Sequence, residues 1–237
     1  MKILITNDDS IKAKGLWELV KLSKKYGEVK VLAPAFEQSG KSHSINIHSG
    51  LKLEKFDLED ITVYSLDSTP ADCVRAAYFG LNWDFDIVFS GINCGLNIGE
   101  DIFYSGTCAA ATEAALLGKK GIAFSTVTKT FETFISEFDR IMDYLFSEGL
   151  LDKGSLYNVN VPEIVKGMRL TFQGNNHYDT HFRLNDAGLY VQGGRHHYEV
   201  EKDNTGSDVW AIYNHYISIT PLNYDRTDYE LLRKIGK

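Results

Sequence analysis

Apolar residues follow two alternating patterns along much of the chain. Short apolar runs of strand length are separated by longer segments in which apolar residues recur every three or four positions, as on one face of a helix. Gly27 follows one such segment as a C-cap would, and Thr69 with Pro70 provides an N-cap and a first-turn proline for another. We expect strands at residues 2–6, 28–33, 61–66, 86–90, 121–126 and 156–161, and helices at 15–26, 70–80, 107–117 and 132–146.

This alternation predicts the fold class. Strands that alternate with helices are typical of an α/β domain, a Rossmann-like, doubly wound and mostly parallel sheet with right-handed connections. A chain of 237 residues suits one such domain, 1–237. Residues 168–200 differ, because they are aromatic, rich in histidine and rich in turns. Within them, residues 181–192 predict a β-hairpin, and since a lone hairpin is marginally stable, we expect it to pack on another subunit.

Composition excludes several classes of protein. The formal net charge is -7 and no cluster of Lys and Arg is present, which argues against binding to a nucleic-acid polymer. No stretch reaches the roughly 20 apolar residues that span a membrane, and the N-terminus lacks a signal-peptide pattern, so we expect a cytoplasmic protein without a membrane anchor. Cys73, Cys94 and Cys108 show no C-x-x-C spacing and are expected to be small buried residues, not a disulfide or zinc site.

Residues 35–44, AFEQSGKSHS, come close to the phosphate-binding P-loop pattern G-x-x-x-x-G-K-[ST]. A P-loop runs into a helix whose N-terminal amides hold the phosphates. Here Ile45 and Ile47 alternate with polar residues, which is the periodicity of a strand. We therefore reject the P-loop interpretation, which leaves a polar loop after a strand. His43 lies in this loop, and no motif gives it a catalytic role.

Asp8 and Asp9 follow the first predicted strand. Ligands of open α/β sheets bind beyond the carboxyl ends of the strands, often near the first strand. Adjacent carboxylates repel each other unless a proton or a cation lies between them, and such pairs commonly bind a hard divalent metal. The alternative is that one Asp caps the next helix and the other is solvated.

Two further loops begin at strand ends. Residues 90–99 carry three glycines, which permit close backbone approach to a ligand, and the oxygens and amides of Asn93 and Asn97. Ser105, Gly106 and Thr107 precede a helix, where an anion is favoured by free amides and by the helix dipole. Simple N-capping is the alternative for this last group.

Together these features indicate metal-assisted hydrolysis of a phosphoester, in which a cation polarises the phosphoryl group and amides neutralise its oxygens. Two rival hypotheses are a non-catalytic sensor of nucleotides or phosphometabolites that uses the same pocket, and a dinucleotide-dependent oxidoreductase. The oxidoreductase lacks the G-x-G-x-x-G pattern.

The chain resembles the SurE (survival protein E) family of metal-dependent nucleotidases. Five segments carry the resemblance in the order found in the family: ITNDD (5–9), APAFEQSGKSHSI (33–45), STPADCV (68–74), SGINCGLNIGEDIFYSGTCAA (90–110) and YISITPL (216–222). The resemblance implies a phosphohydrolase of nucleoside 5′- and 3′-monophosphates, with broader acid phosphatase or exopolyphosphatase activity as an alternative.

The resemblance also implies the site and the assembly. One Mg²⁺ or Mn²⁺ per subunit is expected on Asp8, Asp9, Ser39 and Asn93, while Asn97, Ser105, Gly106 and Thr107 line the phosphate pocket. Asp8 and Asp9 are the catalytic carboxylates, and whether either acts as base, as nucleophile or only as a ligand stays open. Dimers or tetramers that exchange C-terminal segments are expected.

Four positions depart from the family pattern. Ser10 and Ser68 replace glycines, and Asn214-His215 replaces an acidic residue and a glycine. If the turn at Ser10 needs a positive φ, serine is a strained substitute there. The segment GNNHYDTHF (174–182) replaces an Arg-rich stretch, so the substrate range associated with that stretch does not transfer.

Overall fold

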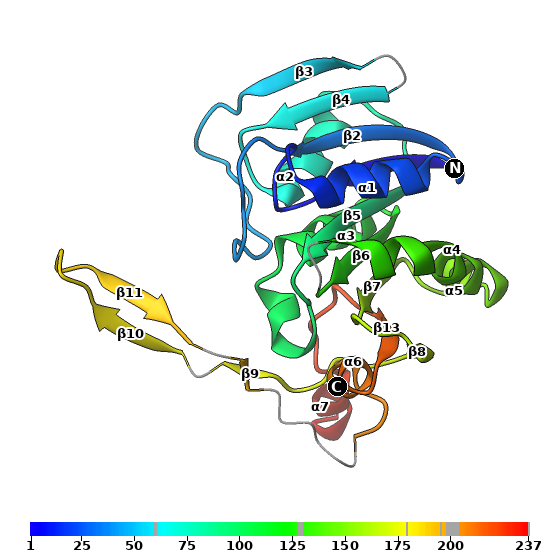
Figure 1. The fold of residues 1–237 in the computed structure, drawn as a ribbon, viewed down its shortest axis with the longest axis vertical. Coiled ribbons are helices and arrows are strands. Elements are labelled where there is room, and N and C mark those ends of the chain that lie inside the picture. Colours follow the sequence, from blue (N-terminus) through cyan, green and yellow to red (C-terminus); the bar gives the residue numbers. More distant parts are fainter. Residues whose placement is uncertain (59–60, 128–129, 179, 195, 198–203, 237) are drawn as a thin grey trace.

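A mostly parallel sheet forms the centre of the molecule (Figure 1). The computed structural model describes the whole chain except residues 59–60, 128–129, 179, 195, 198–203 and 237. In the described residues the sheet has nine strands in the order β3-β4-β2-β1-β5-β6-β7-β13-β8, and only the β3–β4 and β7–β13 pairs are antiparallel. The strands are β1 (Lys2–Thr6), β2 (Glu28–Pro34), β3 (Leu53–Leu58), β4 (Ile61–Leu66), β5 (Ile87–Cys94), β6 (Lys120–Thr126), β7 (Leu156–Val161), β8 (Gly167–Leu170) and β13 (Tyr216–Pro221).

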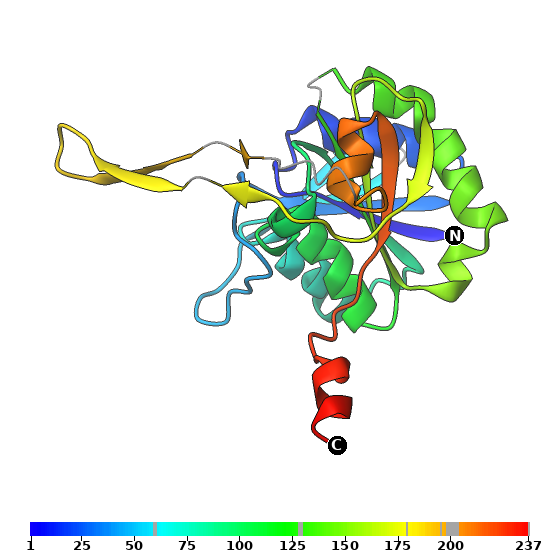
Figure 2. The same ribbon diagram turned by 90° about the horizontal axis from the view of Figure 1, so that it is seen from below.

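Helices cover both faces of this sheet (Figure 2). On one face α1 (Lys14–Ser23), α4 (Glu132–Ser147) and α5 (Leu150–Lys153) cover a core that includes Ile3 and Ile5. On the other face α2 (Pro70–Arg75), its π-helical continuation (Ala76–Gly80) and α3 (Gly106–Leu116) cover Leu4. Because successive strand residues point to opposite faces, β1 feeds both cores. The predicted doubly wound α/β fold is confirmed.

Two local expectations need correction, and one strand was not predicted. Helix α1 ends at Ser23, before Gly27, so Gly27 is not its C-cap. A Cβ atom on Gly27 would lie 1.9 Å from the Met1 carbonyl oxygen, and this close approach explains the glycine. Residues 43–52 form neither strand nor helix, because Ile45 and Ile47 are exposed and find no partner strand. Strand β3, which follows this loop, was not predicted.

The predicted hairpin is confirmed as β10 (His181–Leu184) and β11 (Tyr190–Gly193), which project from the body of the molecule (Figures 1 and 2). Its turn is closed by the Gly188 amide, which donates to the Asn185 carbonyl oxygen at 2.9 Å. Short strands β9 (His177–Tyr178) and β12 (His196–His197) pair at its base. Residues 179, 195 and 198–200 of the predicted extension lie outside the described residues.

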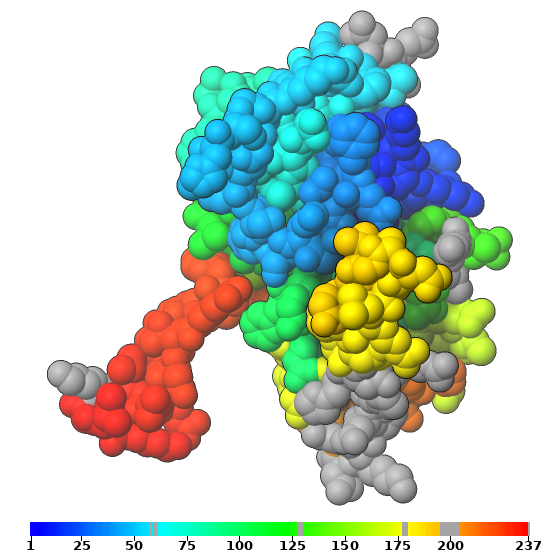
Figure 3. Space-filling view, turned by 90° about the vertical axis from the view of Figure 1, so that its left-hand side faces the viewer, coloured from blue at the N-terminus to red at the C-terminus, as the bar shows by residue number. Residues whose placement is uncertain are grey.

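The last part of the chain also leaves the body. After α6 (Asp208–Tyr213) and β13, the chain runs outward to α7 (Tyr229–Lys234), which buries no side chain and projects in the space-filling view (Figure 3). None of the helices in the described ranges is both long and apolar enough to cross a bilayer. All three cysteines are free, with Cys73 and Cys108 buried as expected and Cys94 half-buried.

Candidate functional site

The predicted site residues follow neighbouring strands at one edge of the sheet. Strands β1 and β5 are parallel neighbours, with Thr6 opposite Ser90. The chain moves from β1 to β2 on one side and later returns to β5 on the other side of β1. This reversal is the topological switch point at which open α/β sheets bind ligands. Asp8 and Asp9 come directly after β1, beside the end of β5.

The Asp8 carboxylate is held by the N-terminus of α3. The Thr107 hydroxyl donates to Asp8 Oδ1 at 2.6 Å, and the Thr107 amide also bonds to the carboxylate. Gly106 lies against the same side chain, since a Cβ atom there would be 2.9 Å from Asp8 Cβ. Burial raises the pKa of Asp8, while the Thr107 hydrogen bonds act to lower it. The close approach of α3 therefore requires a glycine at position 106, and the buried Asp8 carboxylate requires the hydroxyl donor at position 107.

Asp9 carries an uncompensated charge. Burial, together with the negative charges of Asp8 and Glu37, raises the pKa of Asp9 to about 6, although a hydrogen bond from the Cys94 amide acts to lower it. A carboxyl group with this pKa is destabilised in its ionised form by its surroundings. A cation between these carboxylates would remove the conflict.

The loop after β2 approaches the same carboxylates. The Gln38 amide donates to the Asp8 carbonyl oxygen at 2.7 Å, which places Ser39 one residue from this contact. The Ser39 hydroxyl is exposed and donates to Glu37 Oε1 at 2.9 Å. Glu37 was not among the predicted site residues, because a single acidic residue in a polar loop gives no signal in the sequence.

Asn93 lies near the end of β5. Its side-chain Nδ2 donates to the Gly95 carbonyl oxygen at 2.8 Å, so Oδ1 is the atom that Asn93 would offer to a cation. Another buried oxygen, Asn7 Oδ1, has no hydrogen-bond partner among the described residues. Carboxylates with neutral oxygens are the donor set of hard divalent cations, so these residues fit such an ion. No group of three His, Cys, Asp or Glu side chains suited to a metal occurs in the described ranges, so the predicted set relies on Ser39 and Asn93 beside the two carboxylates.

The predicted phosphate residues are engaged within the protein. The Ser105 hydroxyl accepts from the Cys108 amide at 3.0 Å and so caps α3, as the N-capping alternative expected. The Asn97 side chain donates to Ser125 Oγ at 2.8 Å. Gly106 and Thr107 form the first turn of α3 beside Asp8. All four residues thus lie in or beside the loop that runs from β5 into α3.

Two asparagines of β7 hold this loop, a role that no sequence motif indicates. The Asn97 carbonyl oxygen accepts from Asn158 Nδ2 at 2.7 Å and from Asn160 Nδ2 at 3.0 Å. The Asn97 amide donates in turn to Asn160 Oδ1 at 2.9 Å. Because these groups are buried, each lost partner would leave a desolvated polar atom. The alternation of the sequence LYNVNV places both asparagines on one side of the strand.

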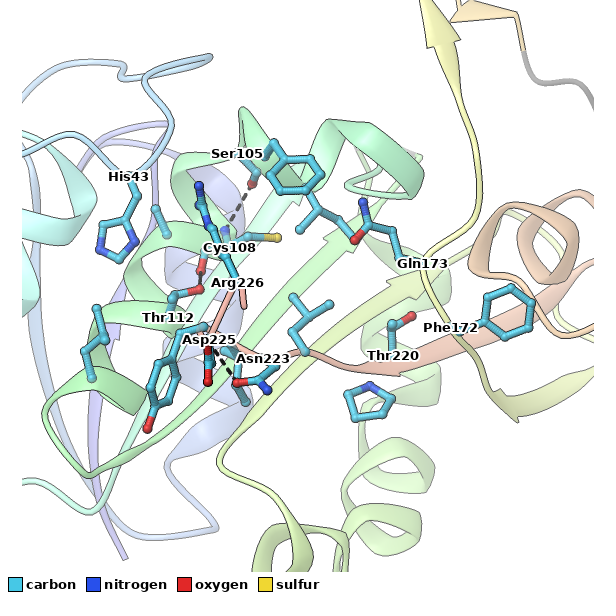
Figure 4. A pocket seen from close by; sticks show the side chains of 18 of the residues that line it. His43, Ser105, Cys108, Thr112, Phe172, Gln173, Thr220, Asn223, Asp225 and Arg226 are labelled. Atoms are coloured by element: carbon cyan, nitrogen blue, oxygen red, sulfur yellow. Dashed lines mark hydrogen bonds between the residues drawn. The ribbon is translucent and has the colours of Figure 1, made fainter. Parts of the chain in front are cut away.

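A cavity of about 890 Å³ adjoins the first turns of α3 (Figure 4). It lies between α3 and the C-terminal segment 220–226, and Ser105, Thr112, His43 and Arg226 are among the residues that line it. Asp8 and Asp9 are not among its lining residues. A second groove, of about 1170 Å³, is lined by Gly40, Tyr104 and residues 192–194 of the hairpin. The Ser39 loop and the residues before α3 therefore line both cavities, through His43 and Ser105 in the first and through Gly40 and Tyr104 in the second.

Comparisons with known proteins point to one family. The family described as Survival protein SurE matches residues 3–180. The chain is 39% identical over 250 residues to the 5'-nucleotidase SurE of Thermoanaerobacter sp. (strain X514), covering 98% of this chain and 96% of that protein. It is also 39% identical over 254 residues to the 5'-nucleotidase SurE of Clostridium botulinum (strain Alaska E43 / Type E3), covering 100% of this chain and 99% of the other. The crystal structure of the SurE protein from Aquifex aeolicus aligns with a TM-score of 0.82 and 34% identity, over 99% of this chain and 98% of that one. The chain belongs to the SurE family.

Proposed function

We propose that this protein is a metal-dependent nucleotidase that hydrolyses the phosphate monoester of nucleoside 5′- and 3′-monophosphates, releasing nucleoside and inorganic phosphate. The relatives named 5'-nucleotidase SurE support this function. The observation that carries it is the Asp8 carboxylate, which α3 fixes beside Asp9 at the switch point of the sheet.

One Mg²⁺ or Mn²⁺ per subunit would be held by Asp8, Asp9, Ser39 and Asn93. When bound, such an ion polarises a phosphoryl oxygen and lowers the pKa of a water molecule. The raised pKa of Asp9 supports this assignment, because it reports negative charge that the protein itself does not neutralise. Ser39 would turn from Glu37 toward the ion, a rotation about one side-chain bond.

The chain's own groups would orient the substrate. Thr107 holds the Asp8 carboxylate in one rotamer by its hydroxyl and its amide. The first turn of α3 presents Ser105, Gly106 and Thr107 to an anion, where the helix dipole favours negative charge. Asn97, which the asparagines of β7 hold in place, would line the other side of the phosphate pocket. Donors that are fixed in advance stabilise charge in the transition state without reorganisation.

The direct test is release of phosphate from 5′-AMP and 3′-AMP with Mn²⁺ and with EDTA. We expect activity with Mn²⁺ only, and Asp8→Asn is expected to abolish it. Asp152→Asn, which alters an exposed carboxylate paired with Lys120, is the matched control. Tight nucleotide binding without phosphate release would favour the sensor, and equal rates on p-nitrophenyl phosphate or polyphosphate would favour a broader phosphatase. Retention of most activity by Asp8→Asn would refute the metal assignment.

A second copy of this chain is the proposed partner of the two projecting segments. Leu184 and Tyr190 are directly opposite each other in the hairpin and are 62% and 71% exposed. Leu231 of helix α7 and Ile235, which directly follows the helix, are also exposed. A two-stranded hairpin gains stability only when its apolar face is covered, so exchange of these segments between subunits would form a homodimer or homotetramer. We also propose a cytoplasmic location, which the three free cysteines support.

A further inference from the structure

The loop that carries Ser39 is held by hydrogen bonds to neighbouring parts of the chain. Residues 35–52 connect β2 to β3 and form no helix or strand. Such a segment keeps one conformation only where specific contacts fix it. The Ser42 amide donates to the Tyr104 carbonyl oxygen at 3.0 Å, and the Ser42 hydroxyl donates to the Phe103 carbonyl oxygen. Further along, the Asn46 amide donates to Asp72 Oδ2 at 2.8 Å.

Between these contacts lies His43, whose Nε2 is 2.7 Å from Glu113 Oε2. Glu113 belongs to α3, and its side chain is only 5% exposed. The other carboxylate oxygen, Glu113 Oε1, accepts from Arg75 Nη1 of α2 at 2.9 Å. One buried carboxylate therefore joins the Ser39 loop to two helices. This is more than the ordinary loop residue that the sequence suggested for His43.

The charge of Glu113 depends on these two partners. Burial would raise the pKa of Glu113, but the hydrogen bonds and charges of His43 and Arg75 outweigh burial and lower it. The buried carboxylate is thus ionised, and its oxygens need donors. Without His43, Glu113 Oε2 would lose a partner that comes from the loop. The contact is strong because one of its partners is charged and largely removed from water.

Helix α3 connects this contact to the metal-binding carboxylates. Its first turn holds Asp8 through Thr107, and its third turn holds the loop through Glu113. The two contacts fix the loop and Asp8 to one rigid element. The position of Ser39 relative to Asp8 is therefore determined at two points of α3, together with the bond from the Gln38 amide to the Asp8 carbonyl oxygen.

We propose that His43 and Glu113 are positioning residues that anchor the Ser39 loop to α3 and thereby set the geometry of the metal site. This inference rests on the proposed metal-dependent function. His43 acts through the loop and needs no contact with the substrate.

The experiment compares the full-length wild-type chain with His43→Ala, His43→Gln and His48→Ala. Gln retains a neutral donor of similar reach, so it is the conservative rescue. His48 is an exposed histidine of the same loop with no side-chain bond to Glu113, so His48→Ala is the matched control. Amide hydrogen exchange of residues 37–48 reports anchoring without any reference to activity, and the dissociation constant for Mn²⁺ reports the metal site. Phosphate release from AMP is measured in parallel.

In His43→Ala we expect faster exchange of residues 37–48 and a Mn²⁺ dissociation constant raised about tenfold, equivalent to ~1.4 kcal/mol. His43→Gln should restore most of both, and His48→Ala should match the wild type. If His43→Ala exchanges like His48→Ala, the anchor does not exist. If exchange rises while Mn²⁺ affinity stays at the wild-type value, the loop is anchored but does not position the metal site, and the proposal is wrong. A wild-type protein without Mn²⁺-dependent phosphate release would refute the proposed function, and the exchange result would still decide the anchor.

Discussion

Thr107 Oγ1 donates a hydrogen bond of 2.6 Å to Asp8 Oδ1, which joins two residues 99 positions apart in the chain. The bond connects the first turn of α3 to the loop after β1 and fixes the carboxylate that the proposed chemistry requires. Both side chains are buried, so solvent does not substitute for either partner.

Thr107→Val keeps the shape of the side chain and removes its hydroxyl. Because a hydrogen bond to a charged group is worth about 1.5–3 kcal/mol, we expect kcat/KM for AMP to fall roughly 10- to 100-fold. Thr112→Val is the control, since the Thr112 hydroxyl donates to the Cys108 carbonyl oxygen within α3 and not to Asp8. Equal kinetics for the two variants would show that Thr107 does not orient Asp8.

Gly106→Ala adds one methyl group at the closest approach of α3 to Asp8. The new Cβ would lie 2.9 Å from Asp8 Cβ and 3.1 Å from Pro70 Cγ, so the Asp8 side chain must move. Alanine favours helices by about 1 kcal/mol over glycine, so the fold should persist while Mn²⁺-dependent activity is lost. Gly50→Ala, where a Cβ meets nothing within 4 Å, should behave as the wild type. Steady-state kinetics and circular dichroism measure both effects.

Asp9→Asn should stabilise the metal-free protein. The pKa of Asp9 is raised from 3.8 to about 6 on folding, so protonation of Asp9 favours the folded state. This stabilisation is complete below pH 3.8 and is lost as the pH rises through 6. At neutral pH the ionised group then costs about 1–2 kcal/mol, after allowance for solvent screening. Urea denaturation in EDTA should therefore show a higher free energy of unfolding for Asp9→Asn at neutral pH, with a weaker decline between pH 4 and 6. A variant less stable than the wild type at neutral pH would contradict this reasoning.

His215→Gly should also stabilise the fold. His215 has a φ of 67°, and Ser10 has a φ of 93°, at two positions where the resemblance to the SurE family implies a glycine. A side chain at positive φ costs roughly 1–2 kcal/mol of stability. Glycine removes this strain, but the greater conformational entropy of glycine in the unfolded chain offsets part of the gain. We expect His215→Gly to raise the free energy of unfolding by about 0.5–1 kcal/mol. His48→Gly makes the same substitution at an exposed position without positive φ, and it should lower that free energy.

The hairpin prediction concerns assembly. Light scattering should give the wild type a mass of two or more subunits. Leu184→Lys combined with Tyr190→Glu removes the exposed apolar pair but places opposite charges across the two strands, which keeps the hairpin itself stable. This double variant should have a lower mass. Arg183→Glu, one residue along on the other face of the hairpin, is the control, and an unchanged mass in the double variant would contradict segment exchange.

The sequence predicted the elements of the fold well because their apolar patterns are long and regular. Strands β4 and β7 have the predicted bounds, and Thr69 caps α2 as expected through a bond from the Asp72 amide. Ile45 and Ile47 show the alternation of a strand but lie in a loop, because alternating apolar residues do not form a strand without a neighbouring strand to pair with. The second half was harder, since β8 is short and half exposed.

For the site, the placement of residues at strand ends could be predicted from the sequence, but most of their contacts could not. Asp8, Asp9 and Asn93 could be placed at strand ends, and the turn at Ser10 has the positive φ that its replacement of glycine suggested. The hydrogen bond from Thr107 to Asp8 could not be predicted, since it depends on how closely α3 approaches the loop after β1. Glu113 was missed for the same reason, because only the folded conformation brings His43 and Arg75 to its carboxylate.

The asparagines of β7 have a consequence for how the sheet aligns. All six residues of β7 are buried, so both sides of the strand face the interior of the protein. In a strand of this kind, burial alone does not distinguish one alignment with its neighbours from an alignment shifted by a residue. A one-residue slip would carry Asn158 and Asn160 to the opposite face, away from the backbone of Asn97, and would leave that backbone without partners. The same two side chains that hold the loop thus select a single register for the strand beside it.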